Sequence, residues 1–301
     1  MRRLLVALSL MGGLLSPAFA ADYDLPILRG SQPVAPIAPV TTVGPATFTR
    51  WSGIYFGGVV SYNNSIADFV NTTAPLIHFS LRSTTLEQTV QPSSIAVLGK
   101  GSDNTVGGGA FFGYNTQWQD LILGVEATYN YTNLNTTAPA SAVARIFPAV
   151  NDAVALSATG RISLSSYGEA RFRAGYIVGD LLPYGFIGMA VGGASYSVTT
   201  SADVAQFTPG SGPPPINPFS CLGTGMTTGN SSSGVCQDIP FFNSAGSNNA
   251  LLWGYSVGAG LDWAVTQHFF LRGEFEFVQF APISSISLEI FSGRVGAGYK
   301  F

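Results

Sequence analysis

The stretch FFLRGEFEFVQF, residues 269–280, places unlike side chains at alternate positions. Four apolar residues occupy odd-numbered positions: Phe269, Leu271, Phe275 and Phe277. The charged residues Arg272, Glu274 and Glu276 occupy even-numbered positions, so the two sets have opposite parity along the chain. Side chains of a β-strand point alternately to its two faces, so the pattern predicts a strand with one apolar face and one charged face. Strands of soluble sheets also alternate, so the surroundings of the apolar face must be inferred from the rest of the chain.

The composition is poor in charge for a soluble protein. Charged residues make up 10% of the 301 residues and hydrophobic residues 46%, and the mean hydropathy is +0.30. Soluble domains usually carry about 25% charged residues. The formal net charge is −3 and no basic patch stands out, which argues against nucleic acid as a partner.

The first twenty residues have the pattern of a secretory signal peptide. Arg2 and Arg3 precede an apolar run over residues 4–15, and Ala18-Phe19-Ala20 matches the usual cleavage site. No run of 18 apolar residues follows, so the sequence predicts no transmembrane helix. Only helices and closed barrels satisfy every backbone group inside a bilayer. An exported chain this apolar is therefore either an outer-membrane barrel or a soluble exported sandwich.

Residues 21–50 contain Pro26, Pro33, Pro36, Pro39 and Pro45. A segment of this kind favours extended polyproline conformations and cannot build a core. We expect a flexible periplasmic arm that acts as a linker, and contact with the cell wall is an alternative use. The barrel itself is then expected over residues 51–301.

Strand character appears in eight segments after residue 50. They are residues 51–62, 104–117, 121–131, 163–178, 182–198, 250–265, 269–280 and 289–301. Short links at 118–120, 179–181 and 266–268 take turns with the longer links 63–103, 132–162, 199–249 and 281–288. Outer-membrane barrels have short periplasmic turns and long external loops, whereas a sandwich has no reason to alternate. The sequence therefore predicts an all-β, eight-stranded antiparallel up-and-down transmembrane barrel.

Aromatic residues gather near the expected strand ends, as they do at the two interfaces of a membrane barrel. Those expected near the periplasmic ends are Trp51, Trp118, Trp263 and Phe301, and those near the opposite ends are Tyr62, Tyr131, Tyr196 and Trp253.

The charged residues of the strands share the parity that faces the barrel interior. The acids are Glu126, Glu169, Asp262, Glu274 and Glu276, and the bases are Arg171, Arg173, Arg272, Arg294 and Lys300. An arginine or lysine on the lipid face near the membrane midplane costs about 2–4 kcal/mol, which sets this orientation. An eight-stranded barrel is filled by its own side chains, and buried charges must pair. We expect a salt-bridged lumen that blocks wide aqueous flow.

The stretches that alternate in this way resemble a family of small outer-membrane surface antigens of alphaproteobacteria, often labelled outer-membrane immunogenic or porin-family proteins. The resemblance is carried by AFAADYDLP at the signal junction, WSGIYFGG at 51–58, GGGAFFGYNTQW at 107–118, LGVEATYNYTN at 123–133, ARFRAGY at 170–176, VGAGLDW at 257–263, LRGEFEFV at 271–278 and RVGAGYKF at 294–301. It covers nearly all the strands but not the long loops. The resemblance implies insertion by the barrel-assembly machinery, with Phe291, Val295, Tyr299 and Phe301 as the signal.

Few residues suggest chemistry. Cys221 and Cys236 are the only cysteines, and in an exported protein they predict a disulfide in the longest loop. Gly254-Tyr-Ser-Val-Gly258 matches a hydrolase motif that needs a strand-to-helix turn, yet it lies mid-strand with Ser256 facing the lumen. His78 and Ser80 bear a superficial likeness to the pair used by lipid A deacylases, although a loop histidine without a role is the simpler interpretation. We expect no cofactor and no bound metal.

These observations predict a monomer with a structural or surface-interaction role in the outer membrane, and at most narrow permeation. The expected partners are outer-membrane lipids, lipopolysaccharide and the assembly machinery. A diffusion porin and a lipid A-modifying enzyme remain alternatives. A further strand pair hidden in the loop 63–103, within residues 86–98 first of all, or in the loop 199–249 would change the strand number by two.

Overall fold

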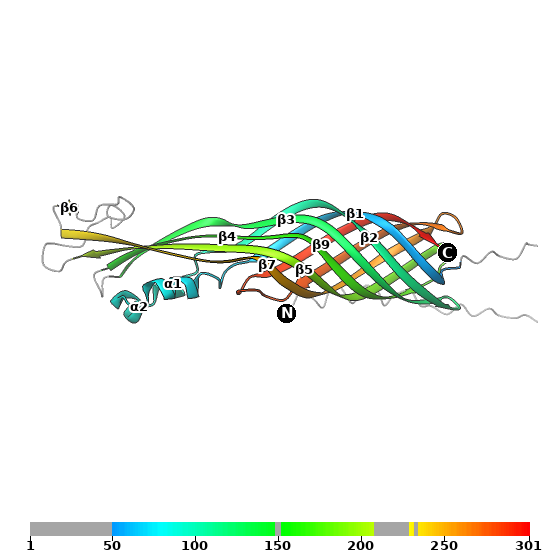
Figure 1. Cartoon of the computed structure of the whole chain (residues 1–301), viewed down its shortest axis with the longest axis horizontal. Coiled ribbons are helices and arrows are strands. Elements are labelled where there is room, and N and C mark those ends of the chain that lie inside the picture. The colour runs from blue at the N-terminus through cyan, green and yellow to red at the C-terminus, as the bar shows by residue number, and fades with distance from the viewer. Residues whose placement is uncertain (1–49, 148–151, 208–228, 232–233) are drawn as a thin grey trace, which may run out of the picture. The chain divides into compact units, whose positions relative to one another are not determined.

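Eight strands close into one antiparallel ring (Figure 1). The computed structural model describes residues 50–147, 152–207, 229–231 and 234–301. The ring consists of β1 (Gly53–Asp68), β2 (Lys100–Trp118), β3 (Leu121–Phe147), β4 (Asp152–Tyr176), β5 (Leu181–Phe207), β7 (Gly234–Ala264), β8 (Phe269–Phe280) and β9 (Ser287–Lys300). Neighbours in this order pair antiparallel, and the pairing of β1 with β9 closes the ring. The predicted eight-stranded barrel is confirmed.

The alternation that opens the sequence analysis governs the strand faces. Along β8, residues of one parity are exposed or half-buried, while Phe270, Arg272, Glu274, Glu276 and Val278 are buried. The same alternation runs along β3 and β4. The short links also lie where the sequence places them, between Trp118 and Leu121, Tyr176 and Leu181, and Ala264 and Phe269.

Four strands run well beyond the length that a bilayer requires. A tilted transmembrane strand needs about 9–11 residues, whereas β3 and β5 each have 27 residues and β7 has 31. The prediction that residues 132–162 and 199–249 form loops is therefore wrong, because most of their described residues belong to strands. The strands continue through them because the two-residue alternation continues, with small and hydroxylated side chains in place of aromatic ones. We call this part of β3, β4, β5 and β7 the extension.

The outer surface of β3 marks where the membrane band ends. Its outward residues are apolar from Leu121 to Tyr131, and they become Asn133, Asn135 and Thr137 beyond that point. Eleven residues of apolar strand match the span needed for a tilted strand. The extension consequently lies past the band, on the side opposite the short turns.

The long link between β1 and β2 forms helices rather than a hidden hairpin. It contains α1 (Ala74–Leu81), α2 (Thr85–Val90) and the 3-10 turn η1 (Pro92–Ser94). Thr84 caps α2 by accepting a hydrogen bond from the backbone N–H of Glu87 at 3.2 Å. The hairpin expected within residues 86–98 is therefore wrong. The three-residue β6 (Gly229–Ser231) pairs with β7 and adds no strand to the ring.

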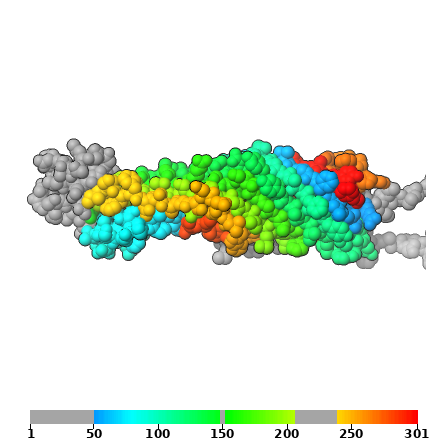
Figure 2. Space-filling model, viewed as in Figure 1, coloured from blue at the N-terminus to red at the C-terminus, as the bar shows by residue number. Residues whose placement is uncertain are grey.

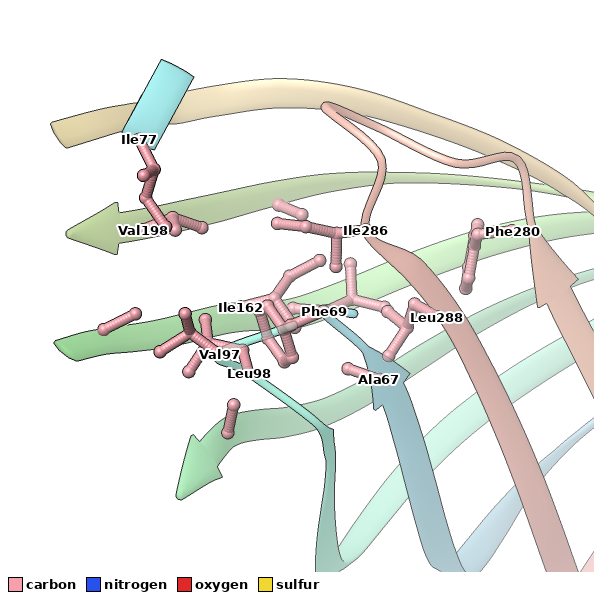
Figure 3. Packing of buried hydrophobic residues seen from close by; sticks show 14 of the residues in the cluster. Ala67, Phe69, Ile77, Val97, Leu98, Ile162, Val198, Phe280, Ile286 and Leu288 are labelled. Atoms are coloured by element: carbon pink, nitrogen blue, oxygen red, sulfur yellow. The ribbon is translucent and has the colours of Figure 1, made fainter. Parts of the chain in front are cut away.

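The helical segment covers the inward face of the extension. Ile77 and Leu81 of α1 are fully buried, and Ile77 points toward Val198 of β5 (Figure 3). Asn243 of β7 donates a hydrogen bond to the carbonyl of Leu76 at 3.2 Å. Figure 2 shows the surface of this segment against that of β7. Within the described ranges, no helix is long and apolar enough to cross a membrane.

Two members of the expected aromatic belts lie elsewhere. Trp51 is buried inside the barrel, and Tyr196 is half-buried with its hydroxyl 2.7 Å from that of Ser284. Residue 51 precedes β1, so strand parity did not fix its direction. Trp118, Trp263 and Trp253 are exposed on the barrel surface as expected.

Candidate functional site

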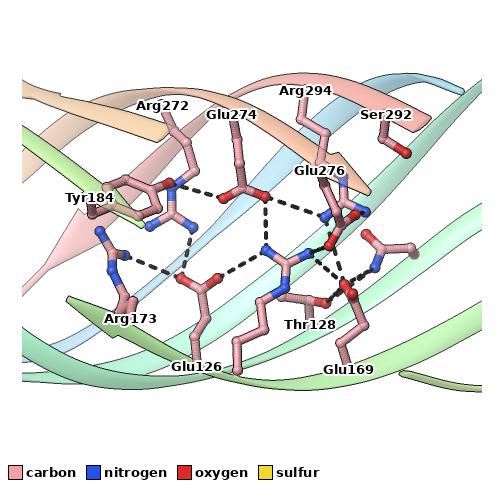
Figure 4. A network of polar contacts seen from close by, with 12 residues as sticks. Glu126, Thr128, Glu169, Arg173, Tyr184, Arg272, Glu274, Glu276, Ser292 and Arg294 are labelled. Atoms are coloured by element: carbon pink, nitrogen blue, oxygen red, sulfur yellow. Dashed lines mark hydrogen bonds and ion pairs between the residues drawn. The ribbon is translucent and has the colours of Figure 1, made fainter. Parts of the chain in front are cut away.

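The barrel interior is the candidate functional site, and it is divided into three layers. A cluster of aromatic and aliphatic side chains fills the end near the short turns. An ionic layer occupies the middle (Figure 4). A larger apolar cluster fills the end that leads into the extension.

The ionic layer contains nine buried charged side chains on five strands. They are Glu126, Glu169, Arg171, Arg173, Asp262, Arg272, Glu274, Glu276 and Arg294. The sequence predicted all nine to point inward, because each has the parity opposite to the apolar face of its strand. The structure brings them together as one connected set of ion pairs.

Arg171 of β4 lies at the centre of this layer. Its guanidinium is 2.8 Å from Glu274 and 3.6 Å from Glu126, and it also pairs with Glu169 and Glu276. Four carboxylates therefore share one cation. A buried carboxylate that loses its partner is strongly destabilising, so the arrangement depends on this arginine.

Arg294 of β9 pairs with three of the same four carboxylates. Its guanidinium lies 3.4 Å from Glu274 and 3.7 Å from Glu169, and it pairs closely with Glu276. Thr128 and Asn130 of β3 donate further hydrogen bonds to Glu169, at 2.7 and 2.9 Å. Hydrogen bonds of this kind offset the cost of removing a carboxylate from water.

A second group of pairs lies toward the short turns. Arg173 is 2.7 Å from Asp262 and 3.3 Å from Glu126. Arg272 approaches the same two acids, at 2.8 Å from Asp262 and 2.7 Å from Glu126. Because Glu126 also faces Arg171, it joins the two groups into one network.

Tyrosine hydroxyls complete the network, and the sequence analysis missed them. Tyr55 donates to Glu126 and Tyr184 donates to Glu274, both at 2.9 Å. Tyr167 accepts a hydrogen bond from Arg294 at 2.9 Å. The signal was present, since Tyr184 has the same parity in β5 as the buried Phe186 and Ala190. The sequence analysis assigned aromatic residues of the strands to the membrane-facing surface and therefore did not predict these inward tyrosines.

Lys300 is buried as expected but is not ion-paired with any of the nine charged side chains of the ionic layer. Its ammonium donates to the carbonyl of Arg50 at 2.9 Å and lies 4.1 Å from the ring centroid of Trp51. It therefore belongs to the aromatic layer at the end of the barrel. The sequence could place Lys300 on the inner face, but not at a depth along the barrel.

The aromatic layer closes the end near the short turns. Phe270 sits among Trp51, Tyr55 and Phe111, with ring centroids 5.9 to 6.1 Å apart. Gly298 makes room for it, since a Cβ there would lie 2.3 Å from the Phe270 ring. These rings pack against one another as one cluster at this end of the barrel interior.

The apolar layer closes the other end. Phe69, Leu98, Ile162, Ile286 and Leu288 meet there from four different parts of the chain (Figure 3). Phe69 follows β1 and Leu98 precedes β2, so the helical segment between them enters and leaves through this layer. All five side chains are buried.

The residues considered for catalysis are not brought together. His78 bonds through its ring nitrogen to Glu87 at 2.9 Å, whereas Ser80 donates to the carbonyl of Leu76 in its own helix at 3.0 Å. Positions two apart on a helix do not face each other, so the suggested pair is wrong as a geometric pair. Ser256 lies in β7 with a buried hydroxyl and without the turn that the hydrolase motif needs.

The remaining candidates are only partly described. Cys236 lies in β7, but Cys221 falls outside the described residues, so the disulfide stays a prediction. The residues expected to signal assembly lie on the outward parity at the end of the chain: Phe291, Val295, Tyr299 and Phe301. Tyr299 packs edge-on against Phe301, with ring centroids 5.0 Å apart. Their role in assembly also stays a prediction.

Comparisons with solved structures give matches at low identity. The attachment invasion locus protein Ail of Yersinia pestis, in complex with the heparin analogue sucrose octasulfate, is 12% identical, with 83% of this chain and 99% of that chain covered and a TM-score of 0.32. Neisserial surface protein A is 12% identical, with 83% of this chain and 98% of that chain covered and a TM-score of 0.32. The outer membrane protein OprG of Pseudomonas aeruginosa is 10% identical, with 83% of this chain and 96% of that chain covered and a TM-score of 0.33.

No curated protein matches the chain. A family match, in contrast, covers residues 37–301 and includes every strand of the ring. The family is described as the outer membrane protein beta-barrel domain. The alternating faces, the closed ring and this match agree, and the chain belongs to the outer membrane protein β-barrel family.

Proposed function

We propose that this protein is a non-conducting outer-membrane barrel that presents its extension for interactions at the cell surface. The observation that supports the closed lumen is its filling along the whole length, by aromatic rings, then by paired ions, then by apolar side chains. A diffusion porin needs a continuous aqueous path, and the filling of the interior by these layers is the argument against one.

The surface role is supported by the different sizes of the segments at the two ends of the barrel. The extension and its helical segment together are far larger than the turns at the other end. Loops held on a rigid scaffold are where recognition usually resides. The resemblance to small surface antigens points the same way. The partners proposed here are outer-membrane lipids, lipopolysaccharide and the barrel-assembly machinery, with the barrel acting as a monomer.

Planar-bilayer recording of the purified, detergent-refolded protein tests the closed lumen. The expected result is no steady porin-sized conductance under conditions in which an established general porin conducts. Folding must be verified in the same sample by the gel shift between unheated and boiled protein, which folded barrels show. A large and steady conductance from folded protein would contradict the proposal.

A further inference from the structure

The outward face of the extension is lined by hydroxyl groups. The inward face, in contrast, is covered by α1 and carries buried apolar side chains of the extension. Cross-strand pairing sets Ser157 of β4 beside Ser201 of β5, and Thr159 beside Thr199. Ser201 in turn pairs with Phe242 of β7. We call these five residues the hydroxyl face.

A groove of about 350 Å³ follows the hydroxyl face. Ser141 of β3 joins all five residues in lining it, and the rest of its wall is alanine. The hydroxyls of Ser157, Thr159 and Thr199 are exposed, and in the part of the chain that the structure describes they are not engaged with another side chain. They are available as donors and as acceptors.

Phe242 supplies the aromatic surface of the groove. It is 74% exposed, whereas the preceding Phe241 packs against the apolar cluster on the inward face. Exposure on this scale is not needed for folding, because Phe241 already anchors this part of β7. A bare aromatic ring beside free hydroxyls is a platform on which a flat apolar surface can stack while its polar edge is hydrogen-bonded.

A second groove of about 360 Å³ continues along β5 and β7. Ser197, Ser244, Gly246 and Asn248 contribute to its wall. The two grooves meet at the pair Thr199 and Ser244. The continuous strip suits an extended ligand better than a compact one.

The chemistry of the strip selects an uncharged, polyhydroxylated ligand. None of the side chains that line either groove is charged, so neither anionic nor cationic ligands gain an ion pair there. Arg161, the cation on the adjoining part of β4, is bound to Asn135 at 2.9 Å. Sugar rings have a C–H face that stacks on an aromatic ring and an edge of hydroxyls, and this strip offers a counterpart to both.

The edge of the sheet offers a less suitable site. Over residues 237–250, β7 pairs with β5 alone in the described structure, which leaves an open edge. Pro240 lies within it, and proline on an edge strand interrupts pairing with another chain. The outward face is therefore the better candidate for binding.

We propose that the hydroxyl face and its continuation bind a neutral saccharide chain of the surrounding lipopolysaccharide. The proposal rests on the surface role given above, since the extension must stand beyond the membrane band. Lipopolysaccharide saccharide chains project from the outer leaflet, on the side where we propose that the extension lies. Phe242 would stack on a sugar ring, and Thr159 and Thr199 would hydrogen-bond to its hydroxyls.

The test uses full-length protein in detergent and titrates it with the neutral fraction of the polysaccharide that mild acid releases from lipopolysaccharide when it removes lipid A. Binding is followed by saturation-transfer NMR and calorimetry. The expected result is saturable binding that weakens about tenfold in Phe242→Ala, the scale of one aromatic contact. Thr159→Val with Thr199→Val, which keep the side-chain shape, should weaken binding as well.

The matched control is Phe79→Ala, which removes a phenylalanine that is 59% exposed on α1, away from the grooves. This variant should bind as the unaltered protein does. Each variant must keep the gel shift of the folded barrel.

Absence of saturable binding at millimolar saccharide, or unchanged affinity in Phe242→Ala, would overturn the proposal. Concentration-dependent dimerisation that Phe242→Ala abolishes, without saccharide binding, would overturn it in favour of a self-association face. The binding experiment gives no information on conductance. Its failure is therefore distinguishable from failure of the proposed closed lumen, which the planar-bilayer recording tests.

Discussion

At the scale of single residues, the ionic layer depends on geometry that only a few side chains provide. Arg171 reaches four carboxylates because a guanidinium offers five N–H donors in a fixed plane. A lysine at this position would present one compact charge and could not bridge the same set. The sequence predicts that Arg171 points inward, but its position among four carboxylates follows from closure of the ring.

Arg171→Met should destabilise the folded barrel by about 3–5 kcal/mol, because the buried carboxylates lose a shared partner while the apolar stem is retained. Urea unfolding in detergent micelles, followed by tryptophan fluorescence, measures the change. Arg145→Met is the control, since Arg145 is exposed in the extension and should cost little. Equal stabilities for the two variants would show that the network is not needed for folding.

At the scale of elements, the segment between β1 and β2 is an independent layer on the extension. Its helices are short, and isolated helices of this length are marginal in water. Their stability must come from burial of Ile77, Leu81 and Leu86 against the sheet. The segment should therefore unfold locally more readily than the ring does.

Leu81→Ala should loosen the helical segment without opening the barrel. Truncating a fully buried leucine costs about 2–5 kcal/mol, which exceeds what so small a unit can lose and remain docked. Limited proteolysis should then cut within residues 70–99, while the barrel fragment keeps its gel shift. Phe79→Ala, on the exposed side of α1, should leave the cleavage pattern unchanged. Loss of the gel shift in Leu81→Ala would show instead that the segment and the ring fold as one unit.

At the scale of the whole molecule, the proposed closure of the lumen rests on three layers of side chains. The aromatic layer, the ionic layer and the apolar layer each fill a different depth of the barrel. Eight strands enclose an interior that side chains can fill, so closure follows from strand number together with side-chain size. No one layer has to carry it.

Replacing residues 70–97 by a short Gly/Ser link should leave the barrel non-conducting. The deletion removes the helical cover and part of the apolar layer, but the ionic and aromatic layers remain. The measurement is planar-bilayer conductance of the deletion variant beside the intact chain. A steady conductance that appears only in the deletion variant would identify the helical segment as the plug and the deeper layers as permeable.

Local periodicity was enough to foresee the barrel, the short turns and the inward set of charges. It could not foresee where strands end, because Ser, Thr and Ala in residues 132–147 alternate without the aromatic contrast that marks a membrane strand. Helices α1 and α2 were missed for a related reason. Their apolar residues are few, and burial against the extension, rather than an intrinsic pattern, holds them in place.

The sequence by itself determined which side of the charge-bearing strands β3, β4, β7, β8 and β9 faces lipid, because a charge in the hydrocarbon region is too costly to tolerate. Only the tertiary structure decided the depth of each inward side chain and hence its partners. Closure of the ring with its particular stagger brings Arg171 to Glu274 and Glu276, more than a hundred residues away, and leaves Lys300 with Trp51 instead. Parity is a local property of the backbone, whereas depth depends on the register of every strand pair between two residues.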